Sequence, residues 1–147
     1  VDAPSKYATR WAGLSNVKKI IWHYEANTDH ARIKALNNLL KKKKIQTGLA
    51  IKPNTSLAKI KDLIKDFNTI QIMAIKPGAQ GRNFQPKILS NIRALRHRYP
   101  NLNIAVDGGV NDKNFSAIKK AGANIIAIGS YLQKSPDMKK ALAKLKT

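Results

Sequence analysis

Three glycine-containing segments of this sequence have the residue types that loops use to hold phosphate groups. Each follows a short apolar run, and together they contain Gly78, Gly81, Gly108, Gly109, Gly129 and the adjoining Ser130. Glycine has no Cβ, so its backbone can approach an anion closely. The alternative is that each segment is an ordinary tight turn. The carboxylate of Asp107, directly before the second segment, is the nearest group that could exchange a proton.

Other side chains with chemical potential are few. The chain has no cysteine, which excludes disulfides, thiolate metal sites and a cysteine nucleophile. Of its three histidines, His30 falls in the first turn of a predicted helix and His97 lies between two arginines, so both are expected to be exposed. The lack of cysteine is compatible with a reducing compartment, and we expect a cytoplasmic protein.

The charge balance is strongly basic. Lys and Arg number 28 against 8 Asp and Glu, a formal net charge of +20, and Glu25 is the sole glutamate. Such a charge makes nucleic acid a candidate partner. The alternative is a lysine-rich solvated surface, because the lysines are scattered over several segments. With 43% hydrophobic residues the chain is expected to fold.

No membrane partner is expected from the sequence. The longest apolar stretches, such as residues 124–132, are far shorter than the roughly 20 residues that a membrane-spanning helix needs. No basic-then-apolar stretch at the start reads as a signal peptide.

The elements that position these groups follow one repeated pattern, a short apolar run and then a helical pattern. Strands are predicted over residues 20–24, 47–51, 70–75, 104–106 and 125–128. Helices are predicted over residues 28–40, 57–64, 86–95, 112–121 and 136–146, with an isolated helix over 4–13. Strands that alternate with helices indicate an α/β fold, a parallel sheet with right-handed crossovers.

The spacing of the repeats predicts a partial TIM barrel or an open sheet. Each unit has about 22–33 residues, the unit size of a barrel that distributes about 250 residues over eight units. Five units do not make eight. We therefore expect a single domain over residues 1–147 that holds only part of a barrel.

Five motifs resemble the ribulose-phosphate 3-epimerase family, in order and over essentially the whole chain. Residues 72–84 (IMAIKPGAQGRNF) are similar to the sixth-strand signature, and 105–111 (AVDGGVN) to the seventh. Residues 121–130 resemble the eighth, while 22–26 (WHYEA) and 48–53 (GLAIKP) match the fourth and fifth. The resemblance implies a TIM barrel of which this chain has strands four to eight.

The resemblance also indicates which family motif the first residues match and which reaction the family catalyses. Residues 1–4 look like the tail of the third-strand motif, where the family often has a preceding methionine. Removal of an initiator methionine would make Val1 a natural N-terminus; a boundary within a longer protein is the alternative. The family epimerises a ketopentose phosphate at C3 with two aspartates and a divalent metal (Zn, Fe or Mn).

Of the family's four metal ligands and two aspartates, only Asp107 has a counterpart here. We expect it to be catalytic and metal-binding by resemblance, and we do not expect this chain alone to hold the metal, since catalytic sites need about three protein ligands. His23 matches a family histidine that is not a ligand and is interpreted as structural.

The phosphate half of the family site is better preserved. Phosphate commonly binds in TIM barrels at the loops after strands seven and eight, where Gly108, Gly109, Gly129 and Ser130 fall. Gly78 and Gly81 come from the sixth-strand loop, and Met73 matches a family residue that packs under the substrate. Two departures affect substrate fit: Ala79 and Gln80 replace a family Phe-Gly pair, and Ala74 replaces a threonine.

Two functional hypotheses follow. In the first, the chain binds a phosphorylated sugar and catalyses epimerisation only when another copy or an N-terminal piece completes it. In the second, it is a degenerate, non-catalytic basic module that binds RNA or a ribonucleoprotein. Its phosphate contacts would come from three basic clusters: residues 41–44, Arg93 with Arg96 and Arg98, and Lys139 with Lys140, Lys144 and Lys146. Exposed strand edges and apolar interior groups further predict a homo-oligomer, most simply a dimer.

Overall fold

The computed structural model describes residues 3–76 and 83–145 and confirms the predicted fold class. Five parallel strands alternate with helices in one open sheet of order β1-β2-β3-β4-β5, so β1 and β5 are its outer strands. The sheet is not closed into a barrel. The chain divides into two compact units, residues 1–51 with 55–70 and residues 52–54 with 71–147. No helix in the described ranges is both long and apolar enough to cross a membrane.

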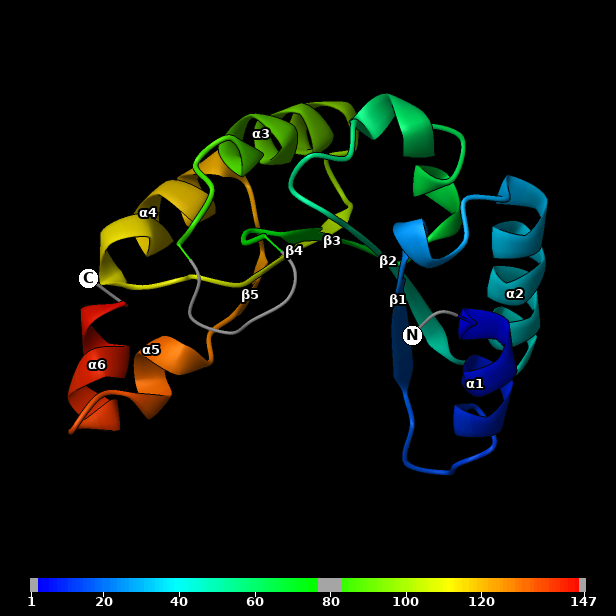
Figure 1. The fold of residues 1–147 in the computed structure, drawn as a ribbon, viewed down its shortest axis with the longest axis horizontal. Coiled ribbons are helices and arrows are strands. Elements are labelled where there is room, and N and C mark those ends of the chain that lie inside the picture. The colour runs from blue at the N-terminus through cyan, green and yellow to red at the C-terminus, as the bar shows by residue number, and fades with distance from the viewer. Residues whose placement is uncertain (1–2, 77–82, 146–147) are drawn as a thin grey trace. The chain divides into compact units, whose positions relative to one another are not determined.

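The first unit pairs β1 (Lys19–His23) with β2 (Gln46–Ile51) and adds α1 (Pro4–Trp11) and α2 (His30–Lys42) (Figure 1). Asp29 caps α2, accepting hydrogen bonds from the backbone N–H groups of Ala31 and Arg32 at 2.9 and 3.2 Å. Ile33 and Leu40 of α2 are fully buried in the core. Short 3₁₀ turns at Tyr24–Ala26, Leu57–Ile60 and Ile64–Asp66 complete the unit.

The helix predicted over residues 57–64 is wrong in type, because the structure has 3₁₀ turns there. The backbone bonds run from residue i to i−3, as from the N–H of Leu63 to the carbonyl of Ile60 at 2.8 Å. The apolar residues Leu57, Ile60 and Leu63 are three apart, which matches the 3.0-residue turn of a 3₁₀ helix. Ile60 and Leu63 are thereby both fully buried.

The second unit contains β4 (Asn103–Asp107) paired with β5 (Ile125–Ala127), and β3 (Thr69–Met73) ends in it. Its helices are α3 (Ile88–Arg98), α4 (Asp112–Ala121), α5 (Ser130–Gln133) and α6 (Met138–Lys144). The predicted last helix over 136–146 is shorter than expected, because Asp137 caps α6 by accepting from the N–H of Lys140 at 2.9 Å. The short α5 before it was missed.

Arg96 connects two elements of the second unit. Its Nε donates to the carbonyl of Gly122, just after α4, at 3.0 Å, and its guanidinium also reaches the carbonyl of Pro100 and the Asn124 side chain. Arg96 was expected in a basic cluster for nucleic-acid phosphates. Because its donors are used inside the fold, only its neighbours Arg93 and Arg98 keep exposed positions in that cluster.

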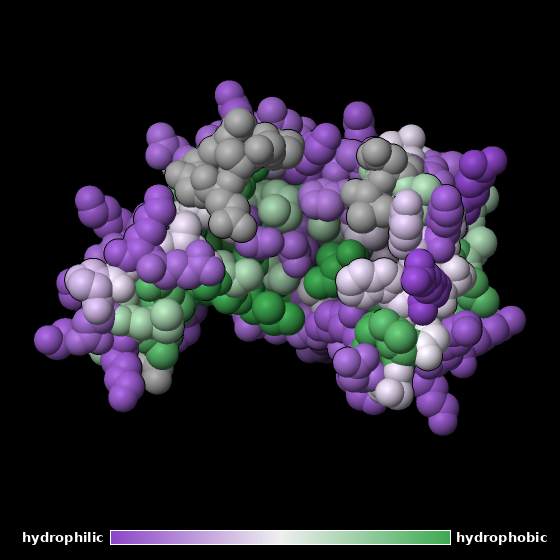
Figure 2. Space-filling view, turned by 60° about the horizontal axis from the view of Figure 1, so that its bottom comes forward, coloured by the Kyte–Doolittle hydropathy of each residue, from purple (hydrophilic) through white to green (hydrophobic). Residues whose placement is uncertain are grey.

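The two outer strands each carry one exposed apolar residue. The large apolar strand residues classed as exposed in the described part of the chain are Ile21 on β1 and Ile125 on β5, each 37% exposed. Gln71 on β3 and Asp107 on β4, both in the second unit, are half-buried polar residues. Figure 2 shows apolar residues between hydrophilic ones on the visible surface.

Candidate functional site

Asp107 ends β4, and the side chain of Gln71 on the neighbouring β3 meets it. Gln71 Nε2 lies 3.4 Å from Asp107 Oδ2 and 3.5 Å from the sulfur of Met73. The N–H of Ala74 donates to the carbonyl of Asp107 at 2.7 Å, which fixes the two strand ends against each other. Gln71 and Met73 are two residues apart, so they project from the same face of β3. The structure thus gathers a carboxylate, a carboxamide and a thioether.

The donor set around Asp107 does not by itself fit a catalytic divalent metal. No group of three His, Asp or Glu side chains that could hold a metal ion occurs within the described ranges. The group of Gln71 that faces the carboxylate is an amide N–H, which is a donor and cannot ligate a cation. Even with the carboxamide oxygen of Gln71 counted, the cluster offers two oxygen-bearing side chains, fewer than the three that a catalytic site needs. A metal at Asp107 therefore needs ligands from outside this cluster.

His23 ends β1 and is held by the glutamate next to it. Its Nδ1 lies 3.3 Å from Glu25 Oε2, and the hydroxyl of Thr55 donates to the other oxygen of Glu25. The contacts agree with the structural interpretation of His23. His30 begins α2 and lies edge-on to the ring of Tyr24, 6.0 Å between centroids.

Gly108 and Gly109 form the turn that leads from β4 to α4, and both have positive φ, +104° and +66°. A Cβ on Gly108 would lie 2.7 Å from Cγ1 of Ile75, so this glycine packs against a side chain. The carbonyl of Gly109 accepts from the Asn114 amide at 2.9 Å, and Asn111 with Asn114 forms a capping box on α4. The turn is therefore tightly specified.

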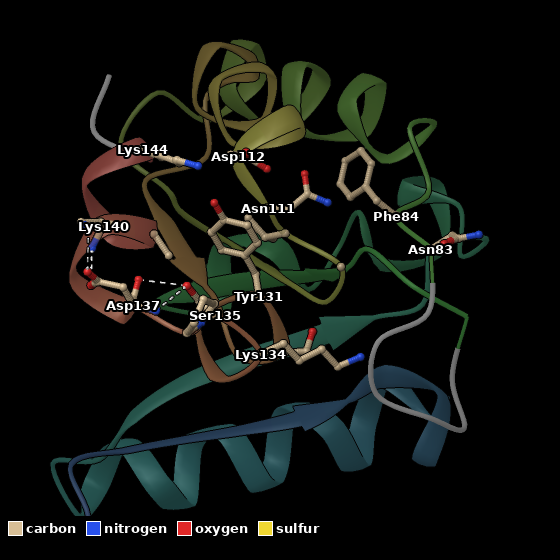
Figure 3. A pocket seen from close by; sticks show the side chains of 15 residues that line it. Asn83, Phe84, Asn111, Asp112, Tyr131, Lys134, Ser135, Asp137, Lys140 and Lys144 are labelled. Carbon is tan, nitrogen blue, oxygen red and sulfur yellow. Dashed lines mark hydrogen bonds and ion pairs between the residues drawn. The ribbon is translucent and has the colours of Figure 1, made fainter.

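A cleft of about 640 Å³ lies between this turn, α4, α5 and α6 (Figure 3). Gly109 and Ser130, two of the residues predicted to hold phosphate, both line it. Figure 3 shows the ring of Tyr131 projecting into its centre, with Phe84 toward one side and Asp137 with Lys140 toward the other.

The cleft contains more basic than acidic side chains. Lys134, Lys140 and Lys144 line it against two aspartates, Asp112 and Asp137. Lys140 is paired with Asp137 at 3.6 Å. Desolvation of the Tyr131 phenol, and then the negative charge of Asp112, raise the pKa of Tyr131 above its ordinary value.

Asp112 also decides which end of the cleft suits an anion. It is the first residue of α4, and its carboxylate accepts from the N–H of Lys113 at 3.1 Å. That negative charge opposes an anion at α4. The cleft residue next to α5 that could attract an anion is Lys134, so the Ser130 side of the cleft is the better place.

The predicted site residues therefore separate into groups. Gly109 and Ser130 share the cleft, and Asp107 and Met73 share the Gln71 cluster. Gly108 and Gly129 adjoin the cleft in sequence without lining it, and Gly78 and Gly81 lie outside the described residues. Gln71 was not predicted from the sequence. A polar residue two positions before Met73 on a predicted strand lies on the same face as Met73, and this could have indicated it. Tyr131 and Lys134, which depend on the unpredicted α5, were also missed.

Comparison with known proteins identifies the family to which the chain is similar. The ribulose-phosphate 3 epimerase family model matches residues 1–133. Ribulose-phosphate 3-epimerase of Candida glabrata is 30% identical over 146 residues, 99% of this chain and 58% of the relative. That of Helicobacter pylori strain 26695 is 35% identical over 146 residues, 97% of this chain and 65% of the relative.

A solved structure supports the fold. A 3-hexulose-6-phosphate synthase superposes with a TM-score of 0.69 at 14% identity, covering 99% of this chain and 66% of that one. The chain spans 50–65% of the length of the curated relatives to which it was compared. It belongs to the ribulose-phosphate 3-epimerase family.

Proposed function

We propose that this chain supplies the phosphate-binding part of a ribulose-phosphate 3-epimerase and binds a phosphorylated pentose. The observation that carries the proposal is the shared cleft of Gly109 and Ser130. The phosphate would lie on the Ser130 side, near the Nζ of Lys134 and away from the carboxylate of Asp112. Tyr131 lines the same cleft, and its phenol can donate a hydrogen bond to a ligand oxygen.

Asp107 would face the sugar end of such a ligand. It is two residues before Gly109 in the chain, so their Cα atoms are at most about 7 Å apart. One carboxylate can exchange a proton on one face of the reacting carbon. Inversion needs a second proton-transfer group on the opposite face, so epimerisation would require completion by a further segment or chain.

Replacing Ser130 by Asp tests the phosphate position. The new carboxylate repels a bound phosphate, and we expect the affinity for ribulose 5-phosphate to fall at least about tenfold, equivalent to about 1.4 kcal/mol. Calorimetric titration with ribulose 5-phosphate and with inorganic phosphate measures this. Ser116→Asp, the same charge change at an exposed position of α4, is the control.

The two variants separate site binding from general charge attraction. Ser116→Asp should bind as the unaltered chain does. Equal weakening by both substitutions would show that the +20 charge, and not the cleft, attracts the ligand. No binding of either probe by the unaltered chain would overturn the proposal.

We further propose that the chain associates as a homodimer through its uncovered sheet. The outer strands β1 and β5 have unpaired backbone edges, and each carries an exposed isoleucine, Ile21 and Ile125. Light scattering at micromolar concentration in about 0.15 M salt should give about twice the 16.3 kDa mass of the chain.

Ile21→Lys should shift this dimer to monomer, because a charged residue on an edge strand opposes pairing. Leu39→Lys is the matched control: Leu39 is 41% exposed and lies on α2, not on an outer strand. A stable monomer in the unaltered chain contradicts the proposal.

A further inference from the structure

We propose that Gln71 positions Asp107 as a metal-free hydrogen-bonding group for the hydroxyls of a sugar phosphate. This proposal rests on the proposed function, and it adds what holds the sugar end of the ligand. Its basis is the meeting of one carboxamide with one carboxylate across two adjacent strand ends, 3.4 Å from Gln71 Nε2 to Asp107 Oδ2.

The two groups are held where they meet by the backbone. The bond of 2.7 Å from the N–H of Ala74 to the carbonyl of Asp107 fixes the register of the strand ends. Gln71 Nε2 also lies 3.5 Å from the sulfur of Met73, so each of its two N–H groups has an acceptor. Both Gln71 and Asp107 are half-buried, which leaves the carboxylate accessible on one side.

The direction of this bond favours a hydrogen-bonding role over a metal-binding one. The Gln71 N–H dipole places its positive end against Asp107 Oδ2. A cation bound at that oxygen would compete with the N–H for the same position and would be repelled by it. Apart from the carboxamide oxygen of Gln71, the remaining electron-pair donor of this cluster is the thioether of Met73, which oxygen-preferring divalent ions bind poorly. An ionised carboxylate offers about four lone-pair positions, so those that Gln71 does not use remain for hydroxyl donors.

The position of Asp107 suits a ligand held at its other end by the cleft. Asp107 and Gly109 are two residues apart, at most about 7 Å between Cα atoms, a span that a pentose phosphate can bridge. A phosphate near Ser130 would then orient the sugar hydroxyls toward the carboxylate. Gln71 would fix the carboxylate without contacting the phosphate.

Two substitutions of Gln71 test the proposal. Gln71→Leu removes the amide donor, and we expect the affinity for ribulose 5-phosphate to fall about 5- to 20-fold while the affinity for inorganic phosphate stays within about twofold. Gln71→Glu places a second carboxylate beside Asp107, and we expect this variant to gain Mn²⁺ binding, detected by electron paramagnetic resonance. Gln133→Leu and Gln133→Glu, at an exposed position of α5, are the matched controls.

The measurements are made on the full chain with and without EDTA. We expect EDTA to leave ribulose 5-phosphate binding by the unaltered chain unchanged, and Asp107→Asn added to Gln71→Glu to abolish the gained Mn²⁺ site. A purely structural role of Gln71 would lower the melting temperature without producing that gain.

Three results would overturn the proposal: Mn²⁺ binding at Asp107 in the unaltered chain, weakening of pentose binding by EDTA, or unchanged pentose affinity in Gln71→Leu. Loss of the proposed function has a different signature, since it appears as no phosphate binding and no effect of Ser130→Asp. The Mn²⁺ gain in Gln71→Glu needs no sugar phosphate, so its absence counts against the proposal in either case.

Discussion

The 147-residue chain alone, supplied with Zn²⁺, Mn²⁺ or Fe²⁺, is expected to epimerise ribulose 5-phosphate at least about 1,000-fold more slowly than complete members of the family. Inversion needs proton transfer on both faces of C3, and one correctly placed acid or base contributes about 10²- to 10⁴-fold. Among the described residues, Asp107 is the one carboxylate at the strand ends of the second unit that could transfer a proton, and it lies beside an amide donor.

Proton exchange and inversion can be measured separately. In D₂O, NMR detects deuterium at C3 of ribulose 5-phosphate as well as the appearance of xylulose 5-phosphate. A single base at Asp107 could exchange the C3 proton without inversion, and Asp107→Asn should abolish any such exchange. Turnover near the family's rate that Asp107→Asn abolishes would contradict the prediction.

The converse experiment is to add to this chain the part of a relative that lies outside the match. The Helicobacter pylori relative has about a third of its length outside its match to this chain, which covers 65% of it. Supplying that part, fused or added separately, should raise epimerase activity if it brings the missing proton-transfer and metal-binding groups. Ser130→Asp should lower the restored activity through substrate binding, and Ser116→Asp should not.

The strand pattern was readable from the sequence because each strand is a short apolar run between loop residues. The runs at 47–51 and 104–106 lie within β2 and β4. Helix type was harder to predict. Leu57, Ile60 and Leu63 fit either a helical face or a 3₁₀ turn, and the i to i−3 bonds of the folded chain decide between them. Arg96 was read as surface charge because its acceptors, such as the Gly122 carbonyl, are distant in sequence.

The candidate site was predictable only as far as its loops. Gly109 and Ser130 follow β4 and β5, and the carboxyl ends of neighbouring parallel strands meet at one edge. The contact between Gln71 and Asp107 joins residues 36 positions apart and depends on side-chain direction. Lys134, which directly follows α5, was not predicted at the cleft because α5 itself was not predicted.

Replacing Gly108 by Ala is expected to destabilise the second unit by about 2–5 kcal/mol. The left-handed backbone conformation costs a non-glycine residue roughly 1–2 kcal/mol, and Gly108 has φ of +104°. The added Cβ would also lie 2.7 Å from Cγ1 of Ile75, and such overpacking typically costs about 1–3 kcal/mol. Urea unfolding followed by circular dichroism measures the loss.

Gly129 is the matched control for this substitution, because it belongs to the other predicted phosphate loop. Its φ is −110° and a Cβ there would have no atom within 4 Å, so Gly129→Ala should change the free energy of unfolding by less than about 0.5 kcal/mol. Combining Gly108→Ala with Ile75→Ala should recover part of the steric loss and none of the backbone loss. If Gly108→Ala is as stable as Gly129→Ala, the turn is not held as tightly as its φ and the Ile75 contact require, and Gly108 becomes a candidate for direct phosphate contact instead.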